Sequence, residues 1–116
     1  MAKAPVSSLV SPQELYANSS TEQPLIVIDV RGPGEYAAGH VQGAINIPLG
    51  QLSRKLKQIP RDRSVVTYCN MHQRGESRGE RAAVLLREQG YQVRTIDGGY
   101  PAWKEASLPV VEASQE

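Results

Sequence analysis

Ser64-Val-Val-Thr-Tyr-Cys69 decides the fold class of this chain and contains its only cysteine. The branched and aromatic residues predict a buried strand that ends on the thiol. A polar, glycine-containing segment follows, and Ser77-Arg-Gly-Glu80 then has the capping-box pattern that begins a helix. A thiol that faces a helix N-terminus is stabilised as the thiolate, and the same place binds anions. The stretch therefore favours a thiol enzyme that handles anions.

Predicted strands and helices alternate along the rest of the chain. Leu25–Val30 is nearly continuous apolar sequence, which is typical of a strand covered on both faces. Further strands are predicted at residues 44–47 and 92–96, and helices from residue 11 and at 35–38, 51–59, 77–90 and 101–106. Short connections between them predict an α/β fold, with a parallel sheet of about five strands and helices on both faces. Active sites in such sheets lie at the carboxyl ends of strands, where Cys69 is placed.

The composition is that of an ordinary folded domain. Its 116 residues are 40% hydrophobic and 22% charged, enough for one domain with a core and too few for two. We expect the domain to span residues 9–111, between an N-terminal tail at 1–8 and a C-terminal tail at 112–116. The net charge of +1 gives no reason to expect nucleic acid or an anionic membrane as partner.

Cysteine usage and hydropathy bear on the location of the protein. No apolar run approaches the length of a membrane span, and the N-terminal residues lack the apolar core of a signal peptide. A single cysteine cannot form an internal disulfide framework. We therefore expect a cytoplasmic protein, whose lone thiol stays available for chemistry in a reducing compartment. No short ligand spacing links Cys69 to His40 or His72, so the sequence predicts no metal site.

Three ordered blocks of the sequence resemble the rhodanese-like domain family. They cover roughly residues 9–111, and their order and spacing make the resemblance specific. The blocks are Ile28-Asp-Val-Arg31 with Glu35-Tyr36 and Gly39-His-Val-Gln-Gly-Ala-Ile-Asn-Ile-Pro48, then Val65-Val-Thr-Tyr-Cys69, then Asp97-Gly-Gly-Tyr-Pro-Ala-Trp103 with Leu108-Pro-Val110. The resemblance implies a single rhodanese-like domain with a compact α/β fold and sulfurtransferase chemistry.

The resemblance gives Cys69 the role of nucleophile. In the family, this cysteine attacks a sulfane sulfur donor such as thiosulfate and becomes a persulfide, whose outer sulfur passes to cyanide, a thiol or a protein. No acid–base triad is required when the leaving group is a stable anion such as sulfite, and no cofactor is implied. The implied partners are a small-molecule sulfur donor or a persulfide-bearing protein, with a protein as one kind of acceptor.

The segment after Cys69 departs from the family pattern. Typical members run through four residues to an arginine and then directly into a helix, whereas here about four extra residues follow Arg74. Either Arg74 binds the anion and the extra turn bulges out, or Arg78 at the helix start takes that role. Together with the main-chain amides of residues 70–75, the predicted donor-binding residues are Asn70, Met71, His72, Gln73, Arg74, Gly75 and Arg78.

Other polar and aromatic residues are interpreted as structural. Asp29 and Arg31 at a strand end are expected to form an ion pair that holds neighbouring loops. His40 is expected to be a hydrogen-bonded structural histidine. Tyr100 and Trp103 are expected to pack in the core or at its rim.

Two other functions stay open. The first is a cysteine-dependent phosphatase or arsenate reductase, although the arginine position five intervening residues beyond Cys69 falls on Gly75. The second is a non-catalytic binding module that displays a loop to a partner protein. In that case Cys69 is a small hydrophobic residue of the core rather than a nucleophile.

Overall fold

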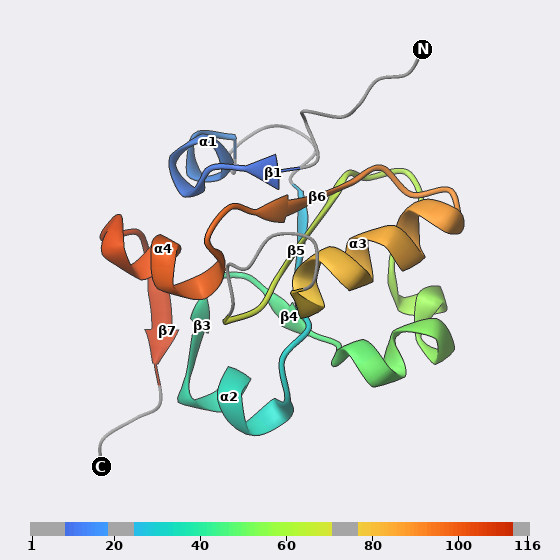
Figure 1. The fold of residues 1–116 in the computed structure, drawn as a ribbon, viewed down its shortest axis with the longest axis horizontal. Helices are drawn as coiled ribbons and strands as arrows, with labels where there is room; N and C mark the ends of the chain where they lie inside the picture. Colours follow the sequence, from blue (N-terminus) through green and yellow to red (C-terminus); the bar gives the residue numbers. More distant parts are fainter. Residues whose placement is uncertain (1–8, 19–24, 71–76, 113–116) are drawn as a thin grey trace.

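The computed structural model describes residues 9–18, 25–70 and 77–112 (Figure 1). Short strands alternate with helices along the chain, in agreement with the predicted pattern. The elements are β1 (Leu9–Val10), α1 (Pro12–Ala17), β2 (Ile26–Asp29), α2 (Pro33–Ala38), β3 (Gly39–Val41), β4 (Ile45–Asn46), η2 (Leu49–Arg54), η3 (Leu56–Gln58), β5 (Val65–Tyr68), α3 (Arg78–Glu88), β6 (Val93–Ile96), α4 (Gly99–Glu105) and β7 (Val110–Glu112).

Five of the strands form one sheet in the order β1-β6-β5-β2-β4. Every neighbouring pair in this sheet is parallel. β5 lies at the centre, so the strand that leads to Cys69 is flanked by β6 and β2. The predicted parallel sheet of about five strands is therefore confirmed.

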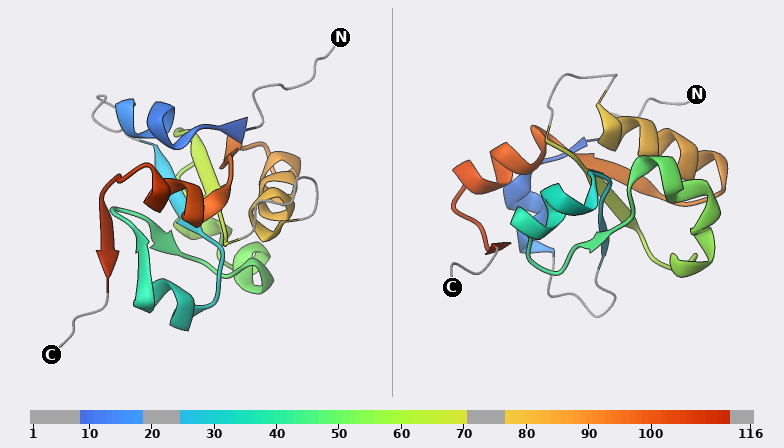
Figure 2. Two further views of the ribbon diagram at one scale, coloured as in Figure 1. Left: turned by 60° about the vertical axis from the view of Figure 1, so that its left-hand side comes forward. Right: turned by 90° about the horizontal axis from the view of Figure 1, so that it is seen from below.

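Helices cover both faces of this sheet (Figures 1 and 2). Side chains along β5 alternate between two apolar cores, as the two-residue period of a strand requires. Val65 belongs to the core beneath α3 and the 3-10 helices η2 and η3, and Cys69 after the strand end belongs to the same core. Val66 and Tyr68 belong to the opposite core, which is covered by α1 and by α4 with its Trp103 side chain. The prediction of helices on both faces is confirmed.

A separate two-stranded antiparallel ribbon was not predicted from the sequence. β3 and β7 pair with His40 opposite Val111. Each strand has only three residues, too few for a period-two pattern to stand out. β7 runs through Glu112, which is the first residue of the range predicted as the C-terminal tail.

Residues 51–59, predicted as one amphipathic helix, form two short 3-10 helices instead. Lys55 donates its amide to Leu52, and Ile59 donates to Leu56, at N–O distances of 3.0 Å each. These i to i−3 bonds define the tighter helix. Leu52 and Ile59 are both buried, so the apolar spacing is correct although the helix type is wrong.

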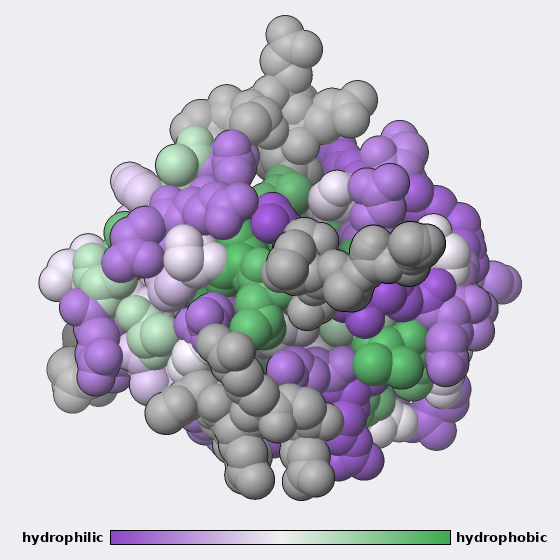
Figure 3. Space-filling view, turned by 45° about the horizontal axis from the view of Figure 1, so that its top comes forward, coloured by the Kyte–Doolittle hydropathy of each residue, from purple (hydrophilic) through white to green (hydrophobic). Residues whose placement is uncertain are grey.

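The outer surface is mainly polar. Polar residues cover most of the periphery of the face in Figure 3, and apolar residues show only as patches. The well-exposed large apolar side chains among the described residues are Tyr16, Ile45, Val84 and Val111, which lie on four different elements. None of the helices in the described ranges is long and apolar enough to cross a bilayer.

The first turn of α3 lies directly against the end of β5. Ser77 caps this helix by accepting a hydrogen bond from the Glu80 amide at 3.0 Å, as the capping pattern predicts. The Thr67 hydroxyl donates to the carbonyl of Gly79 at 2.7 Å. A Cβ atom on Gly79 would lie 3.1 Å from the Cα atom of Tyr68, so any other residue would have to push the two backbones apart by a few tenths of an ångström.

We expect Gly79→Ala to lower the free energy of unfolding by about 1–3 kcal/mol, because the added methyl overpacks the contact with β5. Urea denaturation of the purified variant measures this loss. Gly34→Ala is the matched control, because Gly34 is also the second residue of its helix and a Cβ there meets nothing within 4 Å. The control should be as stable as the wild type or slightly more stable. Equal stabilities of the two variants would contradict the close-approach argument.

Candidate active site

Cys69 directly follows β5, at the carboxyl end of the central strand. Its side chain is 1% exposed and packs in the core on the α3 side of the sheet. The Cys69 carbonyl accepts a hydrogen bond from the Tyr100 amide at 2.8 Å. This bond fixes the end of β5 against the start of α4, so the position of the thiol depends on two segments far apart in the sequence.

Arg78 brings a cation to the same place as the first residue of α3. Hydrogen bonding to Glu35, and in smaller measure the charge of Cys69, raises the pKa of Arg78 above its ordinary value. Arg78 is therefore within electrostatic range of Cys69.

Glu35 of α2 connects the residues on either side of the thiol. Its carboxylate accepts from both terminal nitrogens of Arg78, at 3.1 and 3.3 Å. It also accepts from the Asn70 side-chain amide at 2.9 Å and from the Gly32 main-chain amide at 2.8 Å. The Arg78 hydrogen bonds and then the Gly32 hydrogen bond lower the pKa of Glu35 below its ordinary value. Glu35 thus holds Arg78 and Asn70 in one arrangement.

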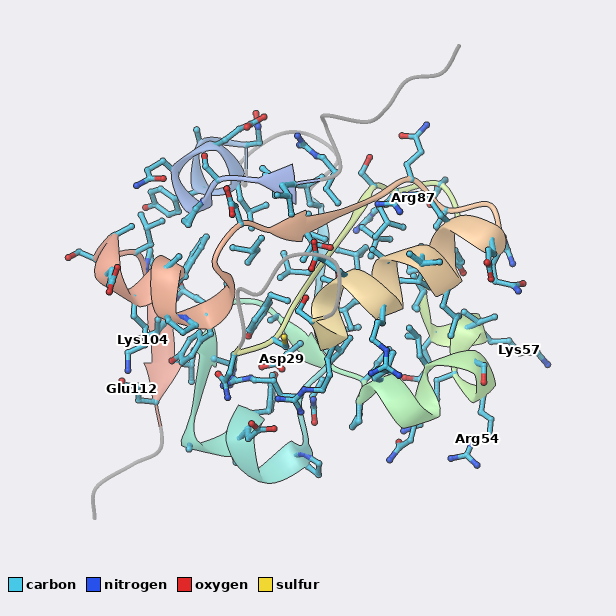
Figure 4. All side chains as sticks on the ribbon, viewed as in Figure 1. Asp29, Arg54, Lys57, Arg87, Lys104 and Glu112 are labelled. Atoms are coloured by element: carbon cyan, nitrogen blue, oxygen red, sulfur yellow. The ribbon has the colours of Figure 1, made fainter. Side chains whose placement is uncertain are left out.

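Asp29 and Arg31 form a buried ion pair next to this arrangement. Figure 4 labels Asp29 in the interior of the molecule. Their side chains are 0% and 3% exposed, and the shortest nitrogen–oxygen distance is 2.6 Å. Arg31 also donates to the side-chain oxygen of Asn70 at 3.0 Å. Burial opposes the charge on Arg31, but hydrogen bonding and attraction to Asp29 outweigh it and raise the pKa of Arg31.

Tyr68 gives Asp29 a second partner from the central strand. Its hydroxyl donates to an Asp29 carboxylate oxygen at 2.8 Å and accepts from the Val41 amide at 3.0 Å. Burial, followed by the negative charge of Asp29, raises the pKa of Tyr68 well above its ordinary value. The hydroxyl therefore stays protonated and keeps donating. Through it, the ion pair is connected to both β5 and β3.

His40 lies in β3 and is held by α2. Its Nδ1 atom lies 2.7 Å from the carbonyl oxygen of Tyr36, and the two rings stack with centroids 3.7 Å apart. The Tyr36 hydroxyl in turn donates to the carbonyl of Ala44 at 2.6 Å. These contacts tie α2 to the loop that follows β3.

The structure brings together several of the residues singled out from the sequence. Asn70 follows Cys69 in the chain and hydrogen-bonds to Arg31 of the buried ion pair. Arg78 is connected to Asn70 through Glu35. The other predicted donor-binding residues lie outside the described residues; they are Met71, His72, Gln73, Arg74 and Gly75.

Sequence reasoning assigned Tyr100 only to packing in the core or at its rim and gave no separate role to Glu35 or Tyr68, although each contacts the site. Glu35 is the third residue of a helix that starts with Pro33, where an acidic residue is expected for helix capping alone. The Gly32 amide is that local capping partner, but the two side-chain donors, Asn70 and Arg78, come from distant positions that no local pattern indicates. Within the described ranges, no group of three His, Cys, Asp or Glu side chains is placed to hold a metal ion.

The geometry is that of a known family. A family model for the rhodanese-like domain matches residues 11–106 of the chain. The chain belongs to the rhodanese-like domain family. The family assignment therefore confirms the resemblance seen in the sequence. The matched range includes both β5, which precedes Cys69, and α3.

Relatives of this rhodanese-like domain occur alone and within longer proteins. The sulfurtransferase of Allochromatium vinosum is 31% identical over 103 residues, which are 88% of this chain and 92% of that protein. The HTH-type transcriptional regulator Rv0324 of Mycobacterium tuberculosis is 39% identical over 90 residues. That match spans 76% of this chain but only 38% of the regulator. The crystal structure of a rhodanese-related protein from Thermoplasma volcanium has a TM-score of 0.77 and 30% identity, covering 88% of this chain and 95% of that one.

We expect the Glu35 carboxyl of this rhodanese-like domain to titrate below its ordinary pKa of 4.5. Because the folded-state pKa is lowered, the stability from this group is present above pH 4.5 and is lost as pH falls through the lower folded value. Carboxyl-detected NMR titration measures it. Arg78→Met should move the pKa of Glu35 back up, whereas Arg94→Met, which breaks the separate pair with Glu14, should not. If Arg78→Met left the pKa of Glu35 unchanged, the hydrogen bonds from Arg78 would not be the cause of its lowered value.

Asp29→Asn should lower the free energy of unfolding by about 3–5 kcal/mol, because it leaves Arg31 buried without its counter-charge. Glu14→Gln is the matched control, since its pair with Arg94 has side chains that are 52% and 31% exposed. Glu14→Gln should lower the free energy of unfolding by only about 0–1 kcal/mol. Thermal or urea unfolding compares the two variants. A loss from Asp29→Asn as small as that of the control would show that the buried pair is not required for stability.

Proposed function

We propose that this chain is a sulfurtransferase that moves sulfane sulfur through a persulfide on Cys69. One observation carries the proposal. The lone thiol lies at the carboxyl end of the central strand, and the first turn of α3, which begins with Arg78, packs against Tyr68 immediately before it. The rhodanese-like family assignment and a relative named sulfurtransferase support the same reaction class.

In the first half-reaction, the Cys69 thiolate attacks the outer sulfur of a donor such as thiosulfate. A new bond forms between the two sulfur atoms, and the sulfur–sulfur bond of thiosulfate breaks. The electron pair leaves with sulfite, so the total charge is unchanged and no oxidant or reductant is needed. Sulfite is a stable anion, and the step therefore needs no general acid.

Donor binding requires positive charge and hydrogen-bond donors around the sulfur. We assign this role to the main-chain amides of residues 70–75 together with Arg74 or Arg78. Two hydrogen bonds with Glu35 orient the Arg78 side chain. In the second half-reaction, a thiophilic acceptor such as cyanide, a thiol or a protein takes the outer sulfur and restores the thiolate. The donor is a small molecule or a persulfide-bearing protein.

Intact-mass spectrometry after exposure to thiosulfate tests the proposal. The wild type should gain the mass of one sulfur atom, and cyanide should remove it with release of thiocyanate. Cys69→Ser should gain nothing, because a hydroxyl cannot carry sulfane sulfur. Ser64→Ala, which lies just before the opposite end of β5, is the control and should behave as the wild type.

Other outcomes would replace the proposal. Turnover of an aryl phosphate or of arsenate without a gain in mass would indicate the phosphatase or arsenate reductase alternative. Binding of a partner protein that survives Cys69→Ser, with no sulfur gained from thiosulfate, a thiosulfonate or a persulfide, would indicate a binding module.

A further inference from the structure

A polar hollow of about 380 Å³ lies at the edge of the sheet opposite Cys69. It is lined by Arg61, Asp62, Arg63, Ser64, Gly90 and Gln92. Ser64 and Gln92 directly precede β5 and β6, so the hollow lies at the amino ends of two paired parallel strands. Cys69 follows the carboxyl end of β5, and the hollow is therefore separate from the proposed active site.

Arg61 is held in a fixed position at the wall of this hollow. Its Nη1 atom donates to the carbonyl oxygen of Gln89 at 2.5 Å, and its guanidinium carbon lies 4.7 Å from the centre of the Tyr91 ring. The Tyr91 hydroxyl donates to the carbonyl oxygen of Ile59 at 2.8 Å and lies 3.2 Å from that of Leu56. These contacts tie the wall to the end of α3 and to η3. A cation that is already positioned loses little freedom when a ligand binds.

Positive charge is concentrated in residues 51–64, the stretch that leads into the hollow. The stretch has five cations and one acid, a net charge of +4 in a chain whose net charge is +1, so the rest of the chain carries −3. All of the cations are exposed except Lys55, which is half-buried. Figure 4 shows Arg54 and Lys57 pointing away from the molecule. The five cations are Arg54, Lys55, Lys57, Arg61 and Arg63.

The five cations have no counter-charges of their own within the described part of the chain. None of them takes part in an ion pair with another described residue. Like charges gathered on one stretch repel one another, and carboxylates supplied by a partner relieve that repulsion. The charge of this surface is therefore complementary to an acidic partner.

The chemistry of the stretch favours an acidic protein over a nucleic acid or a lipid surface. Asp62 stands between Arg61 and Arg63 in the chain and opposes a continuous row of phosphates. Residues 51–64 contain no aromatic side chain on which a base could stack, and their leucines and isoleucine pack in the core rather than insert into a bilayer. Carboxylates spaced along a polypeptide can reach the two arginines without meeting Asp62.

We propose that the hollow and the five cations of residues 51–64 form a docking site for an acidic segment of a partner protein. One carboxylate of that segment enters the hollow and accepts from Arg63 and Ser64. Further carboxylates pair with Lys57 and Arg54 along η3 and η2. A segment bound at this edge of the sheet leaves the opposite edge, with Cys69, uncovered. The inference goes beyond the proposed sulfur transfer and does not depend on it.

The affinity of the full chain for a labelled octaglutamate peptide tests the docking site. Lys57→Gln combined with Arg63→Gln should weaken binding roughly threefold to tenfold, and added salt should weaken binding to the wild type. Arg94→Gln combined with Lys104→Gln is the matched control, because it removes the same net charge from β6 and α4. The control should bind as the wild type does. Equal weakening in the two double variants would overturn the inference, because the peptide would then respond to net charge alone.

NMR shifts of the main-chain amides locate the bound peptide. Octaglutamate should shift the amides of residues 61–64 and 89–92, and octaglutamine, which has no charge, should not shift them. Shifts confined to the start of α3 would overturn the inference, because the peptide would then bind at the proposed active site. Urea unfolding checks that both double variants are folded.

Two further measurements separate this inference from its alternatives. A DNA duplex or phosphatidylserine vesicles that bind these same cations more tightly than the peptide does would overturn it in favour of another class of partner. The gain of sulfur mass from thiosulfate is measured independently on Cys69. Lys57→Gln combined with Arg63→Gln should lose the peptide and keep that gain, so failure of the docking site and failure of sulfur transfer are distinguishable.

Discussion

The buried ion pair between Asp29 and Arg31 is the interaction on which the arrangement of the site depends. Two opposite charges removed from water are tolerated only when each has several good hydrogen bonds. Here Asp29 accepts from Arg31 and from the Tyr68 hydroxyl, and Arg31 also donates to Asn70. The pair therefore joins the ends of β2 and β5. Because Arg31 uses one of its donors on the Asn70 side chain, the same network also fixes the residue that follows Cys69.

Glu35 extends this arrangement from the core to the surface. It contacts Asn70 and Arg78, so the hydrogen bonds run from the buried pair through Asn70 and Glu35 to the first residue of α3. Arg78 has its orientation defined before any substrate arrives. Such preorganisation favours the anion-binding role proposed for Arg78, because a charge that is already fixed loses little freedom when the ligand binds.

Much of the fold and part of the site are predictable from local sequence. The features that are not predictable depend on contacts between segments far apart in the chain. The strand before Cys69, the cap at Ser77 and the helix end at Gly90 depend on neighbouring residues, and each lies where the pattern predicts. The ribbon of β3 and β7 depends on pairing between residues about 70 positions apart. The roles of Glu35 and Tyr100 also depend on contacts between distant segments, which periodicity and capping patterns do not encode.

The pairing of β1 with β6 has a consequence for biosynthesis. The first strand of the chain has its partner at Val93–Ile96, and the Cys69 carbonyl has its partner at the Tyr100 amide. A ribosome makes both of these partners after Cys69, so the nascent chain carries its cysteine for some time before the surrounding structure can close. Completion of the thiol environment therefore requires the chain through Tyr100 to have emerged.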